Sequence, residues 1–423
     1  MVRFGQRREL CVKSRWTGIS ASAWSKMCTG RFRRACYNPP FAKNPVMLKL
    51  RSLLFALVCL PVLAFAQQLP TPPALAAKSW LLIDMSSGQE LAAQAPDERL
   101  EPASLTKLMT AYLSFAALKQ GTIKLDQDVL ISRKAWKTGG SRMFIEVGSE
   151  VKVDDLLKGM IVQSGNDACV ALAEAIAGDE ENFAQMMNRE AQRLGMKGSH
   201  FRNSNGLPDP DHYTTARDLA ILAGALIRDF PEQYAKYYSM KEFRYNDITQ
   251  PNRNRLLWID PTVDGLKTGY TDAAGYCLVS SAKRGPRRLL SVVLGAKSSS
   301  VRIQESLKLL NYGFQFYDGV QLYAKNEAVS SLRVWKGKES TVKIGFADDL
   351  VIVVPKGFGP KIKTELLSQQ PLLAPVTLGQ PLATLKVSLD GKPYGDYPVL
   401  ALEAVPAAGI IGRMADTVRM WFN

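Results

Sequence analysis

The segment EPASLTKLMTAYL holds a serine and a lysine at a spacing that could make a nucleophile and its base. Ser104 and Lys107 are three residues apart, so on a helix they share one face and their side chains can touch. A serine hydroxyl becomes a good nucleophile only when a neighbouring base accepts its proton. A lysine can be that base where burial or nearby positive charge keeps it partly neutral.

The Ser-x-x-Lys pattern is weak when it is taken alone. A serine and a lysine on the surface of any helix have the same spacing, and for an arbitrary copy that is the favoured interpretation. The pattern occurs at least three more times in the chain, at Ser149/Lys152, Ser280/Lys283 and Ser340/Lys343.

A second candidate pair follows in VQSGNDACVALAEA, at the junction of two helical patterns. The hydroxyl of Ser164 could relay a proton, and the amide of Asn166 could hold a substrate carbonyl. Serine and asparagine are also common helix caps. For this segment in isolation, capping is the favoured interpretation.

The triplet Lys-Thr-Gly occurs twice, at residues 137–139 and 267–269. The second copy, in VDGLKTGYTDAAGYCLV, enters a β pattern, and a strand at the edge of a cleft can pair with an extended peptide. Lys267 and Thr268 could then bind a terminal carboxylate, while Gly269 would let the ligand backbone approach closely. A glycine-rich turn with a surface lysine explains this copy equally well. The first copy lies in a Gly-Gly-Ser loop, where we expect it to shape the rim of the cleft.

Helical patterns surround these candidate residues. The segment TTARDLAILAGALI begins with a capping box, in which Thr215 stands three residues before Asp218. A further helix is predicted in RIQESLKLLNYGFQFY. Apolar residues also recur at helical spacing over residues 105–118, 153–162, 168–176 and 181–194.

Strand patterns complete the outline. Two hairpins are predicted, SWLLIDMSSGQELAAQ with its turn at Ser-Ser-Gly and YCLVSSAKRGPRRLLSVVLGA with its turn at Gly285-Pro286. From about Leu322 onward, short alternating segments such as DLVIVVP and ATLKVSL replace the helical patterns, with a hairpin signal at Asp390-Gly391. We therefore predict a mixed α/β domain followed by a small all-β module.

The last residues, GIIGRMADTVRMWFN, return to a helical pattern. An apolar face that ends in Trp421-Phe422 is typical of a helix lying in the membrane interface. Docking on the protein surface is the alternative. The apolar face consists of Ile410, Ile411, Met414, Val418 and Trp421, with Arg413, Asp416 and Thr417 opposite.

The positive charge of the chain is concentrated at its N-terminus. The 423 residues carry a formal net charge of +15, but residues 1–46 hold ten Lys/Arg and one acid. MLKLRSLLFALVCLPVLAFA at 47–66 has the basic start, short apolar run and small-x-small end of a secretory signal, with cleavage expected after Ala66. We interpret residues 1–46 as an upstream-start artefact, with an unusually long leader as the alternative. The remainder carries 42 basic and 38 acidic residues, so nucleic acid is not an expected partner.

The cysteines and histidines favour neither a disulfide framework nor a metal site. Four of the six cysteines precede residue 67, which leaves Cys169 and Cys277 in apolar elements. We expect them to be free core residues rather than a disulfide. The chain has two histidines, His200 and His212, and no Cys/His cluster. A zinc site is therefore not expected, and no cofactor is implied.

The three motifs together, in the order Ser-x-x-Lys, Ser-x-Asn and Lys-Thr-Gly, resemble those of penicillin-binding proteins and serine β-lactamases. The chain is most similar to the low-molecular-mass D-alanyl-D-alanine carboxypeptidases of the penicillin-binding protein 5 type, peptidase family S11. The similarity runs from about Ser79 to the C-terminus. It rests on EPASLTKLMT, QSGNDACVALAE, NRNRLLW, VDGLKTGYTDAAGYCLV and LNYGFQFY.

This resemblance implies a mixed α/β fold of the penicillin-binding and β-lactamase type, with an antiparallel sheet flanked by helices. A small all-β domain and a C-terminal amphipathic helix would follow. The implied division is 67–321 for the carboxypeptidase domain, 322–406 for the β domain and 407–423 for a membrane-anchoring helix. The protein would be periplasmic and peripherally attached to the outer face of the inner membrane, with a role in cell-wall maturation and cell shape.

The resemblance also implies roles for the catalytic residues. Ser104 would be acylated by the penultimate D-Ala of a peptidoglycan stem peptide, with release of the last D-Ala. Lys107 would accept the proton of Ser104, and Ser164 would pass it to the leaving amine. β-Lactam antibiotics would be covalent inhibitors. The oxyanion hole would be the backbone N–H groups of Ser104 and Tyr270, a contribution of roughly 3–4 kcal/mol per donor to the barrier.

The substrate-binding residues follow from the same resemblance. Asn166 would hold the substrate amide, and Lys267, Thr268 and Gly269 would receive the terminal carboxylate and the adjoining backbone. Arg253 in NRNRLLW is a possible second carboxylate contact, and a structural role is an equal alternative.

The chain departs from the family pattern at two places. It has Tyr270 where many relatives carry His after Lys-Thr-Gly, from which we expect altered substrate preference or deacylation rate with activity retained. The segment around Lys137 is also shorter than in relatives, which bears on deacylation. The alternatives are a β-lactamase of the same superfamily and a non-catalytic protein that binds the wall or senses penicillin.

Overall fold

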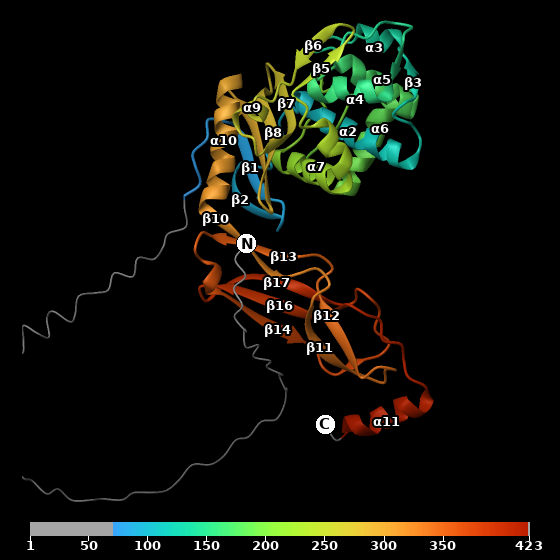
Figure 1. Ribbon diagram of the computed structural model, residues 1–423, viewed down its shortest axis with the longest axis vertical. Coiled ribbons are helices and arrows are strands. Elements are labelled where there is room, and N and C mark those ends of the chain that lie inside the picture. The colour runs from blue at the N-terminus through green and yellow to red at the C-terminus, as the bar shows by residue number, and fades with distance from the viewer. Residues whose placement is uncertain (1–70, 422–423) are drawn as a thin grey trace, which may run out of the picture. The chain divides into compact units, whose positions relative to one another are not determined.

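The structure is a computed structural model that describes residues 71–421 (Figure 1). The expected upstream extension at 1–46, the signal peptide at 47–66 and Phe422 lie outside the described residues. Among the described helices, none is both long enough and apolar enough to span a membrane.

An antiparallel five-stranded sheet lies at the centre of the mixed domain, and an antiparallel sheet flanked by helices is what the family resemblance implies. Both predicted hairpins are confirmed, and the second has Gly285-Pro286 at its turn. Strand β7 is at one edge, paired only with β8. In spatial order the strands are β2 (Gln89–Gln94), β1 (Ser79–Asp84), β9 (Arg287–Ala296), β8 (Gly275–Arg284) and β7 (Val263–Thr271).

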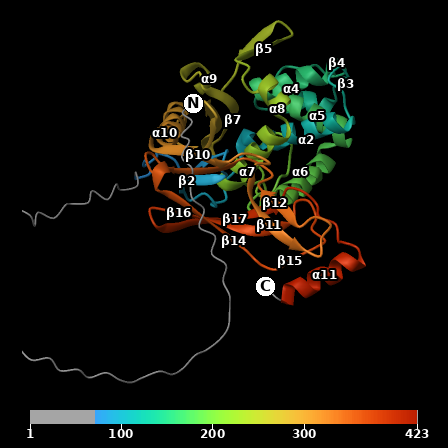
Figure 2. The same cartoon turned by 60° about the horizontal axis from the view of Figure 1, so that its bottom comes forward.

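Successive residues of these strands face two separate cores, because side chains alternate across a sheet. On one face, Leu81 and Val292 share a core with Leu108 of α2 (Lys107–Gln120). On the other face, Leu82 shares a core with Leu309 of α10 (Ser299–Phe316). Figures 1 and 2 show α10 on one side of the sheet and the helices α2 and α5 (Asn166–Ala177) on the other.

The four predicted helical segments are confirmed as α2, α4, α5 and α6, with ends that differ by at most two residues. One half of the predicted capping box of α7 forms, since Thr215 Oγ1 accepts from Asp218 N at 3.0 Å, whereas the Asp218 side chain bonds elsewhere. The Asp218 carboxylate accepts from Gly198 N and Ser199 Oγ. The remaining elements of this domain are η1 (Ala103–Thr106), β3 (Asp128–Leu130), α3 (Arg133–Lys137), β4 (Glu150–Lys152), α4 (Val153–Val162), α5 (Asn166–Ala177), α6 (Glu180–Leu194), α7 (Ala216–Asp229), α8 (Pro231–Tyr237), β5 (Glu242–Tyr245), β6 (Ile248–Pro251) and α9 (Leu256–Ile259).

The all-β module is present, and its first strand starts at Tyr317, five residues before the change of pattern at Leu322. That strand, β10, pairs with β13, and a six-stranded sheet has the order β14-β16-β17-β12-β11-β15. The predicted turn at Asp390-Gly391 joins β16 and β17. The strands are β10 (Tyr317–Tyr323), β11 (Ala328–Trp335), β12 (Thr341–Gly345), β13 (Leu350–Pro355), β14 (Ile362–Ser368), β15 (Leu372–Leu373), β16 (Pro381–Leu389) and β17 (Lys392–Ala401), with the short helix η2 (Gly359–Lys361) before β14.

The last helix, α11 (Ile410–Trp421), leaves its apolar face exposed. Ile411 is 86% exposed and Trp421 is 83% exposed. On the opposite face, Asp416 Oδ2 accepts from the backbone N of Lys336 at 2.7 Å. The polar face therefore contacts the protein, and the apolar face has no partner among the described residues.

The two remaining cysteines are free and buried, as predicted. Cys169 lies in α5 and Cys277 in β8. Burial raises the pKa of the Cys169 thiol to about 12 and that of the Cys277 thiol to about 11, so both stay protonated at neutral pH.

A buried carboxylate fixes the loop that precedes α4 to the first turn of α5. Asp167 is 1% exposed. Its Oδ1 accepts from Met143 N at 3.0 Å and from Ala168 N at 2.9 Å, and its Oδ2 accepts from Phe144 N at 2.9 Å and Ile145 N at 3.4 Å. One side chain thus provides acceptors for three consecutive N–H groups that belong to no helix or strand.

We predict that Asp167→Asn lowers the free energy of unfolding by about 2–3 kcal/mol, because the amide leaves at least one buried N–H without an acceptor. Urea unfolding followed by circular dichroism measures the loss. Asp155→Asn is the control, since Asp155 pairs with Lys158 in a partly exposed contact on α4 and should cost less than about 1 kcal/mol. Equal losses in the two variants would contradict this account.

Candidate active site

The first motif forms where η1 runs into α2. Lys107 is 1% exposed, and its Nζ lies 2.9 Å from Ser104 Oγ. Two further acceptors hold the same amino group, Asn166 Oδ1 at 2.7 Å and the backbone oxygen of Asn205 at 2.6 Å. The lysine is therefore fixed from three directions, one of which is the hydroxyl of the predicted nucleophile.

The other three Ser-x-x-Lys copies form no such pair. They lie in or beside the strands β4, β8 and β12 rather than on a helix. Residues three apart in a strand point to opposite faces, so these serines and lysines do not meet.

The second motif occupies the sharp connection between α4 and α5. Ser164 has a φ of 68°, in the left-handed region that non-glycine residues rarely adopt. Its Oγ accepts from Lys267 Nζ at 2.8 Å. The capping interpretation is wrong, because the N-cap of α5 is Gly165 and no side chain caps the helix. The strained backbone directs Ser164 toward the third motif instead.

The third motif lies on β7, the edge strand. Lys267 and Thr268 are 3% and 5% exposed. At Gly269, a Cβ would lie 3.1 Å from Pro102 O and 3.2 Å from Ala103 Cβ. The glycine therefore allows β7 to pack closely against η1. This explanation of Gly269 differs from the prediction, in which the glycine lets the ligand backbone approach.

Burial controls the charge of both lysines. It lowers the pKa of the Lys107 ammonium to about 8, and the positive charge of Arg253 lowers it further, whereas Asp167 acts in the opposite direction. Burial also holds the pKa of Lys267 well below its usual range, and the charge of Lys107 adds to this effect. A carboxylate bound at Lys267 would favour its charged form.

The motifs open into a cleft with a volume of about 700 Å³. Ser104, Ser164, Asn166 and Thr268 are among the residues that line it. The lining includes three arginines and no aspartate or glutamate, so the cleft suits an anionic ligand. The three are Arg253, Arg255 and Arg302.

Two of these arginines also support the site structurally. Arg253 Nε donates to Gln163 O at 3.2 Å, which is a structural contact of the kind that the sequence analysis gave as an alternative. Arg253 also lines the cleft. Arg302 of α10 is 7% exposed and donates to Gly269 O at 3.2 Å. The sequence analysis missed Arg302, although an arginine on the same helical stripe as Leu309 and Gly313 is a detectable signal.

The cleft rim contains both places where the sequence analysis expects a departure from the family pattern. Gly140 and Ser141, which follow the first Lys-Thr-Gly, line the cleft as predicted, and Gly139 O accepts from Asn166 Nδ2 at 2.7 Å. On β7, Tyr270 is 50% exposed, and its ring centroid lies 4.4 Å from that of Tyr276. The position after the second Lys-Thr-Gly therefore presents an aromatic surface to the cleft.

Comparison with known proteins identifies the family. Residues 66–298 match the family model Peptidase_S11, described as D-alanyl-D-alanine carboxypeptidase, and residues 317–407 match the C-terminal domain of penicillin-binding protein 5. The chain belongs to the S11 family of D-alanyl-D-alanine carboxypeptidases. The predicted activity and fold are thereby confirmed, and the β-lactamase and non-catalytic alternatives are set aside.

Several relatives cover most of both chains. The D-alanyl-D-alanine carboxypeptidase DacC of Escherichia coli K12 is 43% identical over 377 residues, which are 87% of this chain and 94% of DacC. DacF of Bacillus subtilis is 38% identical over 82% of this chain and 90% of its own. Penicillin-binding protein 5 from Haemophilus influenzae superimposes with a TM-score of 0.77 at 42% identity, covering 80% of this chain and 99% of that one.

With Lys107 as the base, we predict that kcat/KM for D-Ala release rises with pH through about 8, because only neutral Lys107 can accept a proton. Removing a neighbouring positive charge stabilises the ammonium form and raises its pKa, so Arg253→Met should move the rising limb to higher pH. Stopped-time assays of D-Ala between pH 6 and 9 measure both effects.

Arg189→Met is the control for this profile, since it removes an exposed positive charge outside the cleft lining. Its rising limb should coincide with that of the wild type. A wild-type rate that is flat or falls over this range would rule out Lys107 as the base.

Proposed function

We propose that this carboxypeptidase removes the terminal D-Ala from peptidoglycan stem pentapeptides through an acyl-enzyme on Ser104. The observation that supports this most strongly is the 2.9 Å contact between the buried amino group of Lys107 and Ser104 Oγ. A buried lysine with a lowered pKa, aimed at a hydroxyl that lines a cleft, is an arrangement suited to nucleophilic catalysis.

The acylation step follows from these contacts. Neutral Lys107 takes the proton of Ser104, and Oγ attacks the carbonyl carbon of the penultimate D-Ala. The backbone N–H groups of Ser104 and Tyr270 stabilise the oxyanion. The bond to the terminal D-Ala nitrogen then breaks, and Ser164 passes the proton to the leaving amine. Water attacks the ester in a second step and regenerates the free serine.

The substrate is held at the edge of the sheet. The peptide pairs with β7, which has an unpaired edge, and its terminal carboxylate binds at Lys267 and Thr268 beside Gly269. Arg302, with its guanidinium at Gly269 O, adds positive charge at the same end of the cleft. Asn166, which already bonds Lys107 and Gly139 O, has one amide hydrogen left for the substrate carbonyl.

β-Lactams should acylate the same serine, because their strained amide resembles the scissile bond and they carry a carboxylate. Penicillin-binding protein D2 from Listeria monocytogenes has been solved in an ampicillin-bound form. It superimposes on 58% of this chain at 30% identity and a TM-score of 0.54. No metal or cofactor is required by the proposed steps.

We further propose that the protein works in the periplasm, attached to the outer face of the inner membrane, where it contributes to cell-wall maturation and cell shape. The exposed apolar face of α11 supports the attachment, since such faces bury in the interfacial region of a bilayer. The division of the chain into a carboxypeptidase domain at 67–321, a β domain at 322–406 and an anchoring helix at 407–423 is part of this proposal. Strand β10, the first strand of the β module, begins earlier than that boundary, at Tyr317.

Ser104→Ala should lower D-Ala release by at least about 1,000-fold, because no other group replaces the nucleophile, and should abolish covalent labelling by fluorescent penicillin. Release from a D-Ala-D-Ala pentapeptide and in-gel fluorescence are the measurements. Ser149→Ala, in another Ser-x-x-Lys copy, should behave as the wild type. Wild-type release by Ser104→Ala would overturn the acyl-enzyme.

Replacing Ile411 and Trp421 together by serine should weaken binding to phospholipid vesicles at least tenfold, since each side chain contributes about 1.5–3 kcal/mol when buried. Co-sedimentation with vesicles measures the binding. Leu378→Ser is the control, because Leu378 is 70% exposed and lies in the β module outside α11. Unchanged sedimentation of the double variant would contradict attachment through α11.

A further inference from the structure

The position of the Lys107 amino group depends on a loop that has no helix or strand to hold it. Residues 203–207 carry the Asn205 oxygen that Lys107 contacts, and they belong to no regular element. Asn203 holds the far side of the loop, where its side chain bonds Gly206 N at 2.7 Å and Leu207 O at 2.9 Å. The near side is fixed by a residue outside all three motifs.

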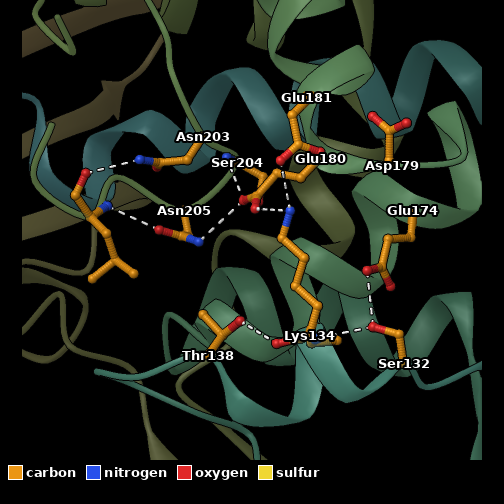
Figure 3. A network of polar contacts seen from close by, with 12 residues as sticks. Ser132, Lys134, Thr138, Glu174, Asp179, Glu180, Glu181, Asn203, Ser204 and Asn205 are labelled. Carbon is orange, nitrogen blue, oxygen red and sulfur yellow. Dashed lines mark hydrogen bonds and ion pairs between the residues drawn. The ribbon is translucent and has the colours of Figure 1, made fainter.

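That residue is Glu180, the first residue of α6. The residue is 8% exposed. Its carboxylate accepts from Ser204 N at 3.1 Å, from Ser204 Oγ at 2.7 Å and from Asn205 Nδ2 at 3.4 Å (Figure 3). All three bonds go to Oε1. One carboxylate oxygen therefore holds the two residues on either side of the peptide bond that precedes Asn205.

The second oxygen of Glu180 links to the opposite wall of the site. Glu180 Oε2 lies 3.2 Å from Lys134 Nζ, and Figure 3 shows that side chain reaching from α3 to the carboxylate. Helix α3 leads into Gly139, whose oxygen accepts from Asn166 Nδ2 at 2.7 Å. Asn166 Oδ1 is the other acceptor of Lys107 Nζ.

We propose that Glu180 is a positioning residue, which fixes both non-nucleophile acceptors of Lys107 and thereby directs its amino group at Ser104. The inference rests on the proposed role of Lys107 as the base. The contacts of Glu180 go to Ser204, Asn205 and Lys134, so it acts through other residues. Lys134 completes the link between the 203–207 loop and α3.

The decisive variant is Glu180→Gln. It keeps the size of the side chain and one acceptor, but it removes the charge that holds Lys134 and Ser204. A loosened Lys107 should lower kcat for D-Ala release at least tenfold, since misplacing a catalytic group by about 1 Å costs up to 100-fold. KM should stay within threefold of the wild type. The rate is expressed per active site, counted by prolonged titration with fluorescent penicillin.

Two further variants separate positioning from a general loss of structure. Glu181→Gln is the matched control, because Glu181 is the next residue, also lies 3.2 Å from Lys134 and has a side chain that is 76% exposed. It should keep the wild-type kcat. Lys134→Met should lower kcat as well, and combining it with Glu180→Gln should cost less than the sum of the two single effects.

The outcomes distinguish this inference from the proposed function. A wild-type kcat per active site in Glu180→Gln, with Ser104→Ala inactive in the same assay, would overturn the role of Glu180 alone. A rise in KM at constant kcat, or a loss of rate matched by a loss of titratable sites, would also overturn it. Activity in Ser104→Ala would overturn the proposed acyl-enzyme and the inference with it.

Discussion

In the proposed mechanism the site depends on one constraint: the amino group of Lys107 must be buried, aimed at Ser104 and still able to lose its proton. Burial lowers the pKa to about 8, which keeps a usable fraction of the amine neutral. A buried amine must also have its hydrogens satisfied. The acceptors come from three places in the chain: η1, the start of α5 and the 203–207 loop. The packing of the helical part of the domain brings these three segments together.

The nature of these acceptors determines whether the lysine can act as a base. A carboxylate in direct contact with Lys107 would hold it in the charged form and raise its pKa. The amino group instead contacts a hydroxyl, an amide oxygen and a peptide oxygen, all of them neutral. The carboxylate of Glu180 lies further away and accepts from the side-chain amide of Asn205, the residue whose backbone oxygen is the last of these. The same reasoning explains a cleft lined by arginines without acids: in the proposed function the substrate carboxylate is the anionic partner of Lys267, and no aspartate or glutamate lines the cleft to compete with it.

The sequence predicts the elements well and the contacts between them poorly. Hairpins, helices and the order of the motifs follow from local periodicity and turn residues, and the family resemblance places Ser104, Lys107, Ser164 and Lys267 in one site. Asn205 could not be predicted, because it acts through a backbone oxygen that every residue has. The capping interpretation of Ser164 failed because a cap and a strained turn favour the same residue types, and only φ separates them. Glu180 could not be predicted either, because an acidic residue in the first turn of a helix is common.

The 203–207 loop also contacts the segment of Ser104, the proposed nucleophile, and this links the two halves of the proposed catalytic pair. At Gly206, with a φ of 87°, a Cβ would lie 1.8 Å from Ala103 O, the residue before Ser104. Only glycine permits that approach, because the backbone conformation and the available space both exclude a side chain. The loop is thus held against η1 on one side and by Glu180 on the other. In the proposed mechanism the base and the nucleophile both depend on this loop, because Lys107 contacts Asn205 O and the segment of Ser104 contacts Gly206. A displacement of the loop would therefore change the distance between Lys107 and Ser104 from both ends.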